Sequence, residues 1–559
     1  MAKMTGGRFI AEFLEKAGVT AVFFVPTMLS RPLAEMDNMK IKRVLCHGEK
    51  AAAYMADGYA RASGRPGICG SQAVGAANIA AGLRDALMGS SPVICFSGGR
   101  KSSEKHKGAY QENDDYPIFE KLTKANLQVD EVTRLPDLMR QAFREATSGN
   151  PGPVNLQLAG NHGQIEDHVA ELELIVEPAY TQVPAFRPAP DPDSVKEAAK
   201  HIMAAKKPVI VIGGGARLSG AAPEAIALAE KLSIPIATSV AAYALVPENH
   251  PLYFGVPGSY SRDCTNKAIM EADLVIYVGS STGGQVTHFW QVPAASTKVI
   301  QIGIDPSDLG RTYPNAASLA GDAKVSLKLL IEQVTRSGDN AAWVDEVQKL
   351  VKTWRGEIAN LRNSDQAPVR PERLMKELGE AMPDNALVVC DTGHTAMWAV
   401  QQLWVDSKNW DFIRCAGSLG WGFPAAIGVK AACPDRPVIC ICGDGGFWYH
   451  VQELETAVRC NLPVVTVVNN NNALNQEHSI FEDAYDGKPS AKSTEMWHHN
   501  KVSFAAIAES MGALGIRVEK AADIGPAVKK ALASGRTAVV EVMGDIEAYA
   551  PKAWTKKKT

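Results

Sequence analysis

Two patterns of hydrophobic positions alternate along the whole chain. Short runs rich in valine and isoleucine, such as AVFFV, PVIVI and PVVTVV, are separated by longer amphipathic stretches rich in alanine, leucine, glutamate and lysine. Such short apolar runs are typical of strands buried on both faces of a parallel sheet, and the stretches between them have the composition of helices that cover a sheet. The pattern therefore predicts an α/β protein.

Two proline-rich segments interrupt this alternation. Residues 177–194 contain five prolines and residues 361–372 contain two, which is typical of linkers. They predict three domains, at 1–176, 190–355 and 368–550. The outer two are expected to share one architecture, and the middle one resembles a Rossmann-type sheet. The expected strands are AVFFVP, IKRVLCH, PGICGS, PVICFSGG and PVNLQLAG in the first domain, PVIVIGGG, IPIATS, DLVIYVGS and KVIQIGID in the second, and ALVVCD, PVICICGDGG, PVVTVVNN and TAVVEVMGD in the third.

Composition narrows the class of protein. Of the 559 residues 46% are hydrophobic and 21% are charged, and 58 basic against 61 acidic side chains leave a formal charge of −3. This balance excludes a disordered chain and argues against a nucleic-acid partner, which would require a basic surplus. No apolar run approaches the ~20 residues of a membrane span and no signal-peptide core is present, so we expect no membrane contact and a cytoplasmic location. The ten cysteines mostly lie within or beside apolar runs and are expected to be reduced and structural.

The densest chemical signal lies at the ends of two expected strands of the third domain. One strand ends in Gly443–Gly446, which includes Asp444, and the next ends in the asparagines Asn469–Asn472. In an open parallel sheet both strand ends meet in one crevice, where ligands bind. Glycines let backbone N–H groups approach a phosphate, and Asp and Asn oxygens suit a Mg²⁺ ion that shares its shell with a diphosphate. The segments predict a metal and diphosphate site, and the alternative is a pair of turns without a ligand.

The 27 positions from Asp444 to Asn471 resemble the GDG…NN signature of thiamine diphosphate enzymes, such as acetolactate synthases, benzoylformate decarboxylases and pyruvate decarboxylases. The resemblance covers essentially the whole chain. It implies three consecutive Rossmann-like domains, of which the N-terminal pyrimidine-binding and the C-terminal diphosphate-binding domain form the cofactor site. The run of asparagines leaves the register open by one residue. The implied metal ligands are Asp444, Asn471 and the carbonyl of Ala473, and the implied cofactor contacts in these segments are Gly443, Gly445, Gly446 and Asn471.

A segment of the first domain, HGEKAAAYMADGYARASGRPG, resembles the stretch that carries the family's cofactor-activating glutamate, which is Glu49 here. A carboxylic acid hydrogen-bonded to N1′ of the aminopyrimidine favours the tautomer whose 4′ nitrogen can take the proton from thiazolium C2. By itself, Glu49 would be interpreted as a surface residue in a first helical turn, which the helix dipole favours. The resemblance implies instead a catalytic, cofactor-binding residue.

Three further segments match places around the cofactor. CAGSLGWGFPAAIG is similar to the family segment whose bulky apolar residue supports the bent cofactor, here Leu419. DTGHTAMW matches the segment that contacts the diphosphate from the far side, which implies His394 and Thr395. Lys124 matches a basic residue near the site, although a solvated lysine at a helix end fits equally well.

Residues that act on the substrate are implied at two places. GAYQENDDY resembles the acetolactate synthase stretch that offers an aromatic residue and a glutamine across a subunit interface, here Tyr110 and Gln111. Glu477, 33 positions after Asp444, matches the substrate-facing glutamate of pyruvate decarboxylases. A glutamate at a helix N-terminus is the alternative for Glu477. His478 beside it is a second candidate proton donor.

The ligand of the middle domain stays open. Gly213–Gly215 follow its first expected strand, but the dinucleotide fingerprint requires a third glycine where Leu218 stands. The arginine motif with which flavin-containing relatives hold FAD is replaced by GSSTGGQVTHFW, so FAD is not favoured. An adenine nucleotide or a CoA moiety could use the same turn.

The resemblance implies a lyase or transferase that uses thiamine diphosphate and Mg²⁺ on a small 2-oxo acid, by decarboxylation, acyloin carboligation or both. One alternative is a lyase for a 2-hydroxyacyl-CoA or a 1,2-diketone with the same cofactor, and another is a non-catalytic nucleotide-binding homologue. In the family the glutamate of one subunit faces the diphosphate site of another. A homodimer or homotetramer with active sites at the subunit interface is therefore implied.

Overall fold

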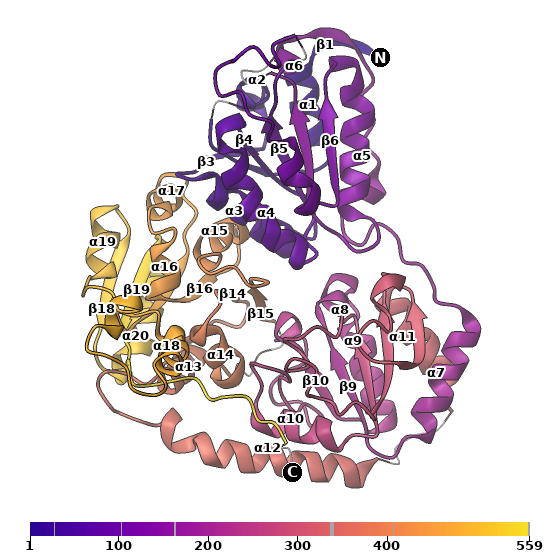
Figure 1. Cartoon of the computed structure of the whole chain (residues 1–559), viewed down its shortest axis with the longest axis vertical. Helices are drawn as coiled ribbons and strands as arrows, with labels where there is room; N and C mark the ends of the chain where they lie inside the picture. Colours follow the sequence, from indigo (N-terminus) through magenta and orange to yellow (C-terminus); the bar gives the residue numbers. More distant parts are fainter. Residues whose placement is uncertain are drawn as a thin grey trace.

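The computed structural model describes residues 1–556, apart from positions 27, 102, 161–163, 336–339, 406 and 408. The chain forms three consecutive α/β units, each built on a parallel sheet (Figure 1). These sheets confirm the α/β class that the apolar runs predicted. Within the described ranges, no helix combines the length and the apolar character needed to span a membrane.

The first unit is a six-stranded parallel sheet with helices on both faces. Its sheet strands are β2 (Ala21–Phe24), β3 (Lys42–Leu45), β4 (Gly67–Ser71), β5 (Val93–Gly98), β6 (Ala125–Val129) and β7 (Val154–Leu158), in the spatial order β3-β2-β4-β5-β7-β6. Its helices are α1 (Gly6–Lys16), α2 (Ser30–Glu35), α3 (Glu49–Ser63), α4 (Ala76–Met88), α5 (Leu135–Thr147) and α6 (Gln164–Asp167), and a short antiparallel pair is formed by β1 (Ala2–Thr5) and β8 (Val169–Leu172). Successive strand side chains point to opposite faces, so Cys69 packs with α3 and α4, whereas Ile68 packs with α1 and α5.

The third unit repeats the architecture of the first. Its strands are β14 (Leu387–Cys390), β15 (Asp411–Arg414), β16 (Val438–Gly443), β17 (Val465–Asn470), β18 (Leu514–Val518) and β19 (Ala538–Met543), in the order β15-β14-β16-β17-β19-β18. Its helices are α13 (Pro371–Ala381), α14 (His394–Gln402), α15 (Gly422–Ala432), α16 (Asp444–Trp448), α17 (Glu453–Arg459), α18 (His478–Ala484), α19 (Phe504–Ser510) and α20 (Ile524–Ala533). When strands are numbered within each unit, both outer sheets have the order 2-1-3-4-6-5. The expected kinship of the outer domains is therefore present in the fold.

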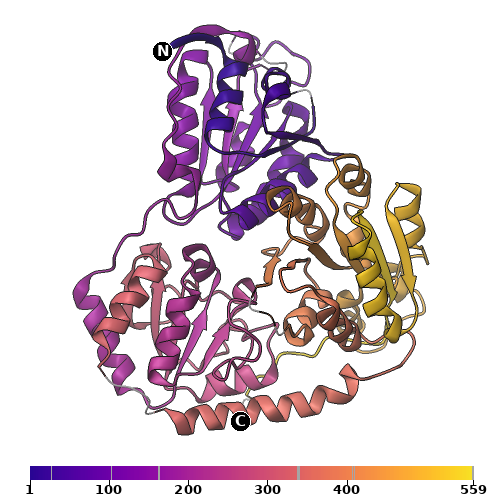
Figure 2. The ribbon, with the colours of Figure 1, turned by 180° about the vertical axis from the view of Figure 1, so that it is seen from behind.

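The middle unit has a five-stranded parallel sheet. Its strands are β9 (Pro208–Ile212), β10 (Ile236–Thr238), β11 (Leu274–Val278), β12 (Lys298–Gly303) and β13 (Asn315–Ala320), in the order β10-β9-β11-β12-β13. Its helices are α7 (Pro192–Ala204), α8 (Gly214–Ser219), α9 (Ala222–Leu232), α10 (Asp263–Glu271), α11 (Ala323–Gln333) and α12 (Ala341–Arg362). The long helix α12 runs below the middle unit to the third unit in both views (Figures 1 and 2).

The glycine turn of the middle unit uses two of its amides within the protein. Gly213 N donates to Val278 O at 2.8 Å, and Gly215 N donates to Gly279 O at 2.8 Å. A Cβ atom at Gly213 would lie 2.3 Å from Gly279 O, so this glycine permits a close approach of two strand-end turns. The turn therefore has a packing role that accounts for its composition.

The outer units pack directly against each other through α3 and α15. Two glycines allow this approach: a Cβ atom at Gly58 would lie 2.2 Å from Ala425 O, and one at Gly428 would lie 1.8 Å from Met55 O. Buried residues of both units form one continuous hydrophobic cluster around these helices. Figure 1 shows α3 and α4 facing α15 and α17 across this junction.

A buried ionic cluster lies at the same junction. Arg61 of α3 donates to both carboxylate oxygens of Asp57 at 2.7 Å and to Asp85 Oδ1 at 2.9 Å. The Trp421 indole donates to Asp57 Oδ2 at 2.8 Å, and Arg61 Nη1 donates to Arg414 O at 2.7 Å. Burial raises the pKa of Asp85, but Arg61 and the surrounding backbone N–H groups outweigh it and hold that pKa below its ordinary value. The cluster thus connects the first unit to β15 and α15 of the third.

We expect Arg61→Met to lower the free energy of unfolding by about 3 kcal/mol, because removal of one member of a buried ion cluster leaves carboxylates buried without their cation. Asp57 and Asp85 are both fully buried. The measurement is chemical denaturation followed by circular dichroism. Arg8→Met is the matched control, since Arg8 pairs with Glu12 on an exposed surface and its loss should cost less than about 1 kcal/mol. Equal losses for the two variants would contradict the stabilising role of the cluster.

Candidate functional site

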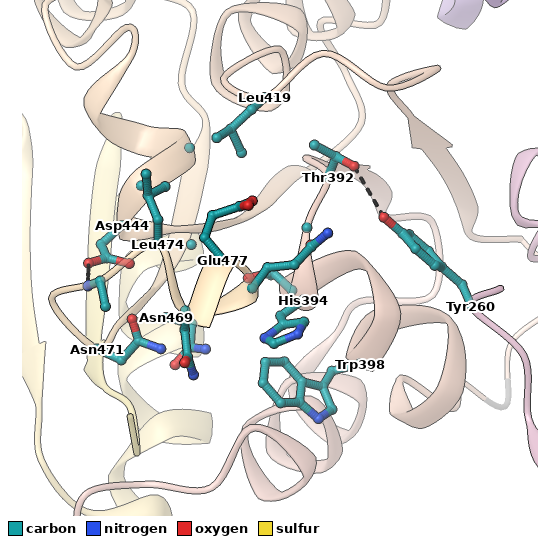
Figure 3. Close-up of a pocket in the computed structure, with 18 of the residues that line it drawn as sticks. Tyr260, Thr392, His394, Trp398, Leu419, Asp444, Asn469, Asn471, Leu474 and Glu477 are labelled. Atoms are coloured by element: carbon teal, nitrogen blue, oxygen red, sulfur yellow. Dashed lines mark hydrogen bonds between the residues drawn. The ribbon is translucent and has the colours of Figure 1, made fainter. Parts of the chain in front are cut away.

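A cavity of about 420 Å³ lies at the junction of the middle and third units. Its walls come from the ends of β14, β16 and β17, from the segment before α15, and from two loops of the middle unit. In Figure 3 Asp444 and Asn471 lie at one side of this space and Tyr260 and Thr392 at the other, with Leu419, Glu477 and His394 between them. The predicted strand-end crevice is therefore present as a cavity.

The two predicted strand ends meet at one side of the cavity. Asp444 begins α16 directly after β16, and Asn471 follows β17, so both residues lie at the carboxyl ends of neighbouring strands. Ala473 N donates to Asp444 Oδ2 at 2.8 Å, which places the Ala473 backbone beside the carboxylate. Asp444 is 2% exposed and Asn471 is 8% exposed. The structure thus brings the three predicted metal ligands together.

The asparagine run divides into residues that face the cavity and residues that do not. Asn469 and Asn471 line the cavity, whereas Asn470 points the other way and donates to Glu541 Oε1 at 2.7 Å. This is the alternation expected of a strand. Asn472 has a φ of 57°, which suits a turn residue. Within the run Asn469–Asn472, two asparagines therefore face the cavity.

The donor groups at this side fit Mg²⁺ and a diphosphate. The Oδ1 atoms of Asn469 and Asn471 are buried and have no hydrogen-bond partner, so they are available as ligands. A carboxylate, an amide oxygen and a backbone carbonyl are the hard oxygen donors that Mg²⁺ prefers. A Cβ atom at Gly445 would lie 2.4 Å from Leu474 Cδ2, so this glycine permits the close packing of Leu474 against its backbone. Across the described residues, no group of three or more His, Cys, Asp or Glu side chains could hold a metal.

The two residues predicted to contact the diphosphate from the far side both lie at the cavity. His394 and Thr395 form the first turn of α14 and line the cavity. Burial lowers the pKa of His394 to about 4, so the ring is neutral near pH 7. Its ring packs edge-on against Trp398 with centroids 5.3 Å apart, and its Nδ1 atom is buried without a partner. A neutral imidazole here can donate or accept one hydrogen bond toward a ligand.

The segment that carries Leu419 is held by two buried carboxylates. Asp85 of the first unit accepts from the N–H groups of residues 416–418 at 2.8, 3.1 and 2.9 Å. Asp391 accepts from Gly420 N at 3.1 Å and Gly422 N at 3.0 Å. Burial raises the pKa of Asp391 to about 6 despite these donors. The Leu419 side chain, which lines the cavity, therefore stands on a segment fixed from both sides.

Glu477 also lines the cavity, and its segment is fixed by the end of the chain. Asn475 Nδ2 donates to Ile546 O at 2.9 Å and to Ala548 O at 3.1 Å. The neighbouring His478 does not line the cavity. Its ring lies 4.7 Å from that of Trp497 and 4.9 Å from that of Tyr549. Of the two candidate proton donors, the structure places Glu477 alone at the cavity.

Within one chain, the site residues predicted in the first unit do not reach the cavity. No described residue of that unit lines it. Glu49 begins α3 and accepts a hydrogen bond from Asn78 Nδ2 at 3.2 Å. Gln111 lies in a loop with a φ of 59°, and the adjacent Tyr110 is 77% exposed. Lys124 directly precedes β6, and its Nζ atom donates to Glu145 O and Ser148 O at the end of α5. One chain therefore brings together the third-unit residues of the predicted site, apart from His478, but not those of the first unit.

Several cavity residues were not predicted from the sequence. Tyr260 and Gln285 come from loops of the middle unit, and Arg414 ends β15. His499 does not line the cavity, but its Nδ1 atom lies 3.7 Å from Asp444 Oδ2. Among these residues, only Arg414 could have been noticed in the sequence. It lies within the apolar run DFIRCAG, and an arginine in a buried strand needs a partner.

Three family models match the chain in sequence order. Residues 4–118 match "Thiamine pyrophosphate enzyme, N-terminal TPP binding domain", and residues 195–330 match "Thiamine pyrophosphate enzyme, central domain". Residues 391–542 match "Thiamine pyrophosphate enzyme, C-terminal TPP binding domain". The last match spans Asp444, Asn471 and Ala473.

Named relatives align over nearly the full length. The chain is 32% identical to "Probable acetolactate synthase large subunit" of Methanocaldococcus jannaschii over 556 residues, which cover 97% of this chain and 92% of that protein. It is 31% identical to "Putative thiamine pyrophosphate-containing protein YdaP" of Bacillus subtilis, with 97% and 92% covered. It is 30% identical to "Glyoxylate carboligase" of Escherichia coli O157:H7, with 95% and 91% covered.

Proposed function

We propose that this chain, which belongs to the thiamine pyrophosphate enzyme family, is an acetolactate synthase-like enzyme. In the proposed reaction a 2-oxo acid loses CO₂ and the remaining acyl unit is joined to the carbonyl of an acceptor. The observation that carries this proposal is the cavity in which the two predicted strand ends meet and Glu477 faces the same space. The names of the full-length relatives support the reaction class.

Asp444, Asn471 and the Ala473 carbonyl would hold Mg²⁺, and the amides of Gly443, Gly445 and Gly446 would contact the diphosphate. The buried, unpartnered Oδ1 atom of Asn471 supports this assignment, because an orphaned buried acceptor is costly without a ligand. His394 and Thr395 would also bind the diphosphate. When bound, thiamine diphosphate supplies the electron sink that a 2-oxo acid needs to lose CO₂.

The remaining residues orient the reactants and move protons. Leu419 would support the cofactor, since the carboxylates of Asp85 and Asp391 fix its segment. The Glu477 carboxyl would hold or donate a proton at a substrate oxygen inside the cavity. Trp398 and Leu474 add apolar surface to the walls, which limits the access of water.

A second chain would complete the site with Glu49, Tyr110 and Gln111. The cavity of one chain lacks any described residue of the first unit, and Tyr110 is exposed on that unit. An aromatic side chain that a partner covers fits both observations. We therefore propose a homodimer, or a tetramer of two such dimers, in which the Glu49 carboxyl of one chain faces the cavity of the other and holds a proton at N1′.

The test uses the purified protein with thiamine diphosphate, Mg²⁺ and a panel of 2-oxo acids. We expect CO₂ release from at least one 2-oxo acid and a new hydroxy-ketone or acetohydroxy acid product by mass spectrometry. Without Mg²⁺ and in the presence of a chelator, both should be lost. Cleavage of a 2-hydroxyacyl-CoA or a 1,2-diketone, with no CO₂ from any 2-oxo acid, would refute the proposal.

A further inference from the structure

Helix α3, which begins with Glu49, has no cap of its own. Its N-cap residue is Gly48, which has no side chain that could accept a hydrogen bond from the first turn. The first N–H groups of a helix lack partners within the helix, so a nearby acceptor normally fixes the start of a helix. The segment that leads into α3 is instead held by an acceptor from another unit.

That acceptor is Glu453, the first residue of α17 in the third unit. Its Oε1 atom accepts from His47 N at 3.1 Å, and the N–H group of Gly48 also donates to the carboxylate. Thr456 Oγ1 donates to Glu453 Oε2 at 2.7 Å and orients the carboxylate from its own helix. In a capping box, a glutamate within the helix binds the N–H group of the N-cap residue. Glu453 takes the equivalent place at α3, although it lies 406 positions after His47.

Glu453 is completely buried, so water does not compete for these contacts. Burial raises the pKa of the Glu453 carboxyl, and the hydrogen bonds from Thr456 and His47 act in the opposite direction. The three groups around the carboxyl are all donors, which suits a carboxylate that only accepts. Hydrogen bonds from backbone N–H groups to an ionised carboxylate are stronger than those to a neutral group. Glu453 therefore holds the start of α3 more firmly than an uncharged side chain could.

Other groups of α17 also join it to the first unit. Arg459 Nη2 donates to Leu45 O at 2.7 Å, and Glu455 Oε2 lies 2.7 Å from His47 Nε2 on the exposed surface. Apolar residues of α17 belong to the hydrophobic cluster that the two outer units share. These contacts join the units without Glu453, whose own contacts in the first unit are to the backbone at the start of α3.

The Glu49 carboxyl has little room to move. A Cβ atom at Gly75 would lie 2.6 Å from Glu49 Oε1, and Asn78 Nδ2 donates to Glu49 Oε2 at 3.2 Å. A displacement of the start of α3 would move the carboxyl relative to both neighbours. Proton transfer requires hydrogen-bond reach, and a misplacement of about 1 Å can lower a rate roughly 100-fold. The backbone that Glu453 holds therefore sets the position of Glu49.

We propose that Glu453 is a positioning residue, which fixes the start of α3 and thereby holds the Glu49 carboxyl where it can reach the aminopyrimidine of the cofactor. This inference rests on the proposed function, in which Glu49 completes the cavity of the partner chain. Each chain thus uses its own third unit to orient the glutamate that it supplies to the other cavity.

The first test is the rate of CO₂ release by Glu453→Gln. We expect a fall of about 20-fold, because glutamine has one acceptor oxygen and its amide N–H₂ group would face N–H donors. The KM for the 2-oxo acid and the affinity for thiamine diphosphate should change less than about 3-fold, since Glu453 does not line the cavity. Glu455→Gln is the matched control on the same helix, because Glu455 contacts the exposed ring of His47 and its loss should lower the rate less than about 2-fold.

A double-mutant cycle shows whether Glu453 acts through Glu49. If it does, Glu453→Gln should leave the residual rate of Glu49→Gln unchanged, because the group that it positions is already inactive. A second loss of the same size in the Glu49→Gln background would overturn the positioning role. Failure of the proposed function looks different, since Glu49→Gln would then keep full turnover or no 2-oxo acid would release CO₂.

Amide hydrogen exchange of the protein without cofactor gives a readout that does not depend on turnover. Measured by mass spectrometry, the peptide that spans residues 45–52 should exchange about 10-fold faster in Glu453→Gln than in the wild type, because its local opening becomes easier. Glu455→Gln should leave this rate unchanged. An unchanged rate in Glu453→Gln would overturn the proposal, whether or not the protein releases CO₂.

A milder pair of variants covers the case in which Glu453→Gln does not fold. Thr456→Val removes a donor to the Glu453 carboxylate, so we expect about 3-fold slower CO₂ release and faster exchange of the same peptide. Thr456→Ser keeps the hydroxyl and should retain the wild-type values in both measurements. Wild-type values in Thr456→Val would overturn the proposal.

Discussion

Replacement of Glu49 by glutamine should lower the rate of CO₂ release about 1,000-fold while thiamine diphosphate still binds. A carboxyl group that shares a proton with N1′ drives the proton transfers of the aminopyrimidine, and general acid-base groups contribute roughly 10²–10⁴-fold to such steps. Glutamine keeps the shape and the hydrogen-bonding capacity of the side chain but cannot exchange the proton. Glu49 begins α3 and has a neutral neighbour, Asn78, so the exchange should not disturb folding.

The measurements for Glu49→Gln are steady-state CO₂ release and cofactor binding by tryptophan fluorescence quenching. Glu271→Gln serves as the control, since Glu271 is an exposed residue at the end of α10. Undiminished turnover of Glu49→Gln would remove Glu49 from the mechanism. A loss of cofactor binding equal to the loss of turnover would make Glu49 a binding residue without a separate chemical role.

Asp444→Ala should weaken the Mg²⁺-dependent binding of thiamine diphosphate about 1,000-fold. Outer-shell changes around a metal cost roughly 10–100-fold, and loss of a direct ligand exceeds this. The variant also removes the acceptor for Ala473 N, so a second proposed ligand loses its support. Cofactor titrations at several Mg²⁺ concentrations measure the effect. Asp435→Ala, an exposed acid of the same unit, is the control, and an unaltered affinity of Asp444→Ala would contradict the metal site.

The same two variants test whether one site draws on two chains. In a mixed dimer of Glu49→Gln and Asp444→Ala chains, one cavity receives both changes and the other receives neither. Random exchange should therefore restore about a quarter of the wild-type activity from two inactive proteins. No recovery in demonstrably mixed dimers would mean that Glu49 serves the cavity of its own chain.

The sequence predicted the central strands of each sheet and missed most strands at the edges. β6, β13, β15 and β18 each lie at the end of a sheet, and their side chains are less completely buried than those of β9 or β16. An edge strand is covered on fewer sides, so its sequence keeps polar residues, as in ANLQV and LGIRV. An apolar run therefore indicates a strand in the middle of a sheet more reliably than a strand at the edge of a sheet.

The site residues, like the strands, include some that the sequence predicted and some that it did not. Asp444 and Asn471 were predictable because strand ends are marked by the apolar runs that precede them. Tyr260 and Gln285 were not, since they come from irregular loops that enter the cavity only through the packing of the middle unit on the third. That packing depends on long-range contacts such as Tyr243 Oη to Leu403 O at 2.6 Å, which no local pattern encodes.

Because the outer units share one core, part of the first unit's core stays incomplete while the rest of the chain is synthesised. The apolar face of α3 is completed by α15, and 369 residues separate Ser63 from Ala432. At roughly 5–20 residues per second a ribosome needs about 20–70 s to supply that partner. The first unit is complete at Leu172, so for most of this interval its helix α3 has a face of alanine and methionine that α15 does not yet cover. Until α15 is made, this helix face is an apolar surface that can associate with a wrong partner.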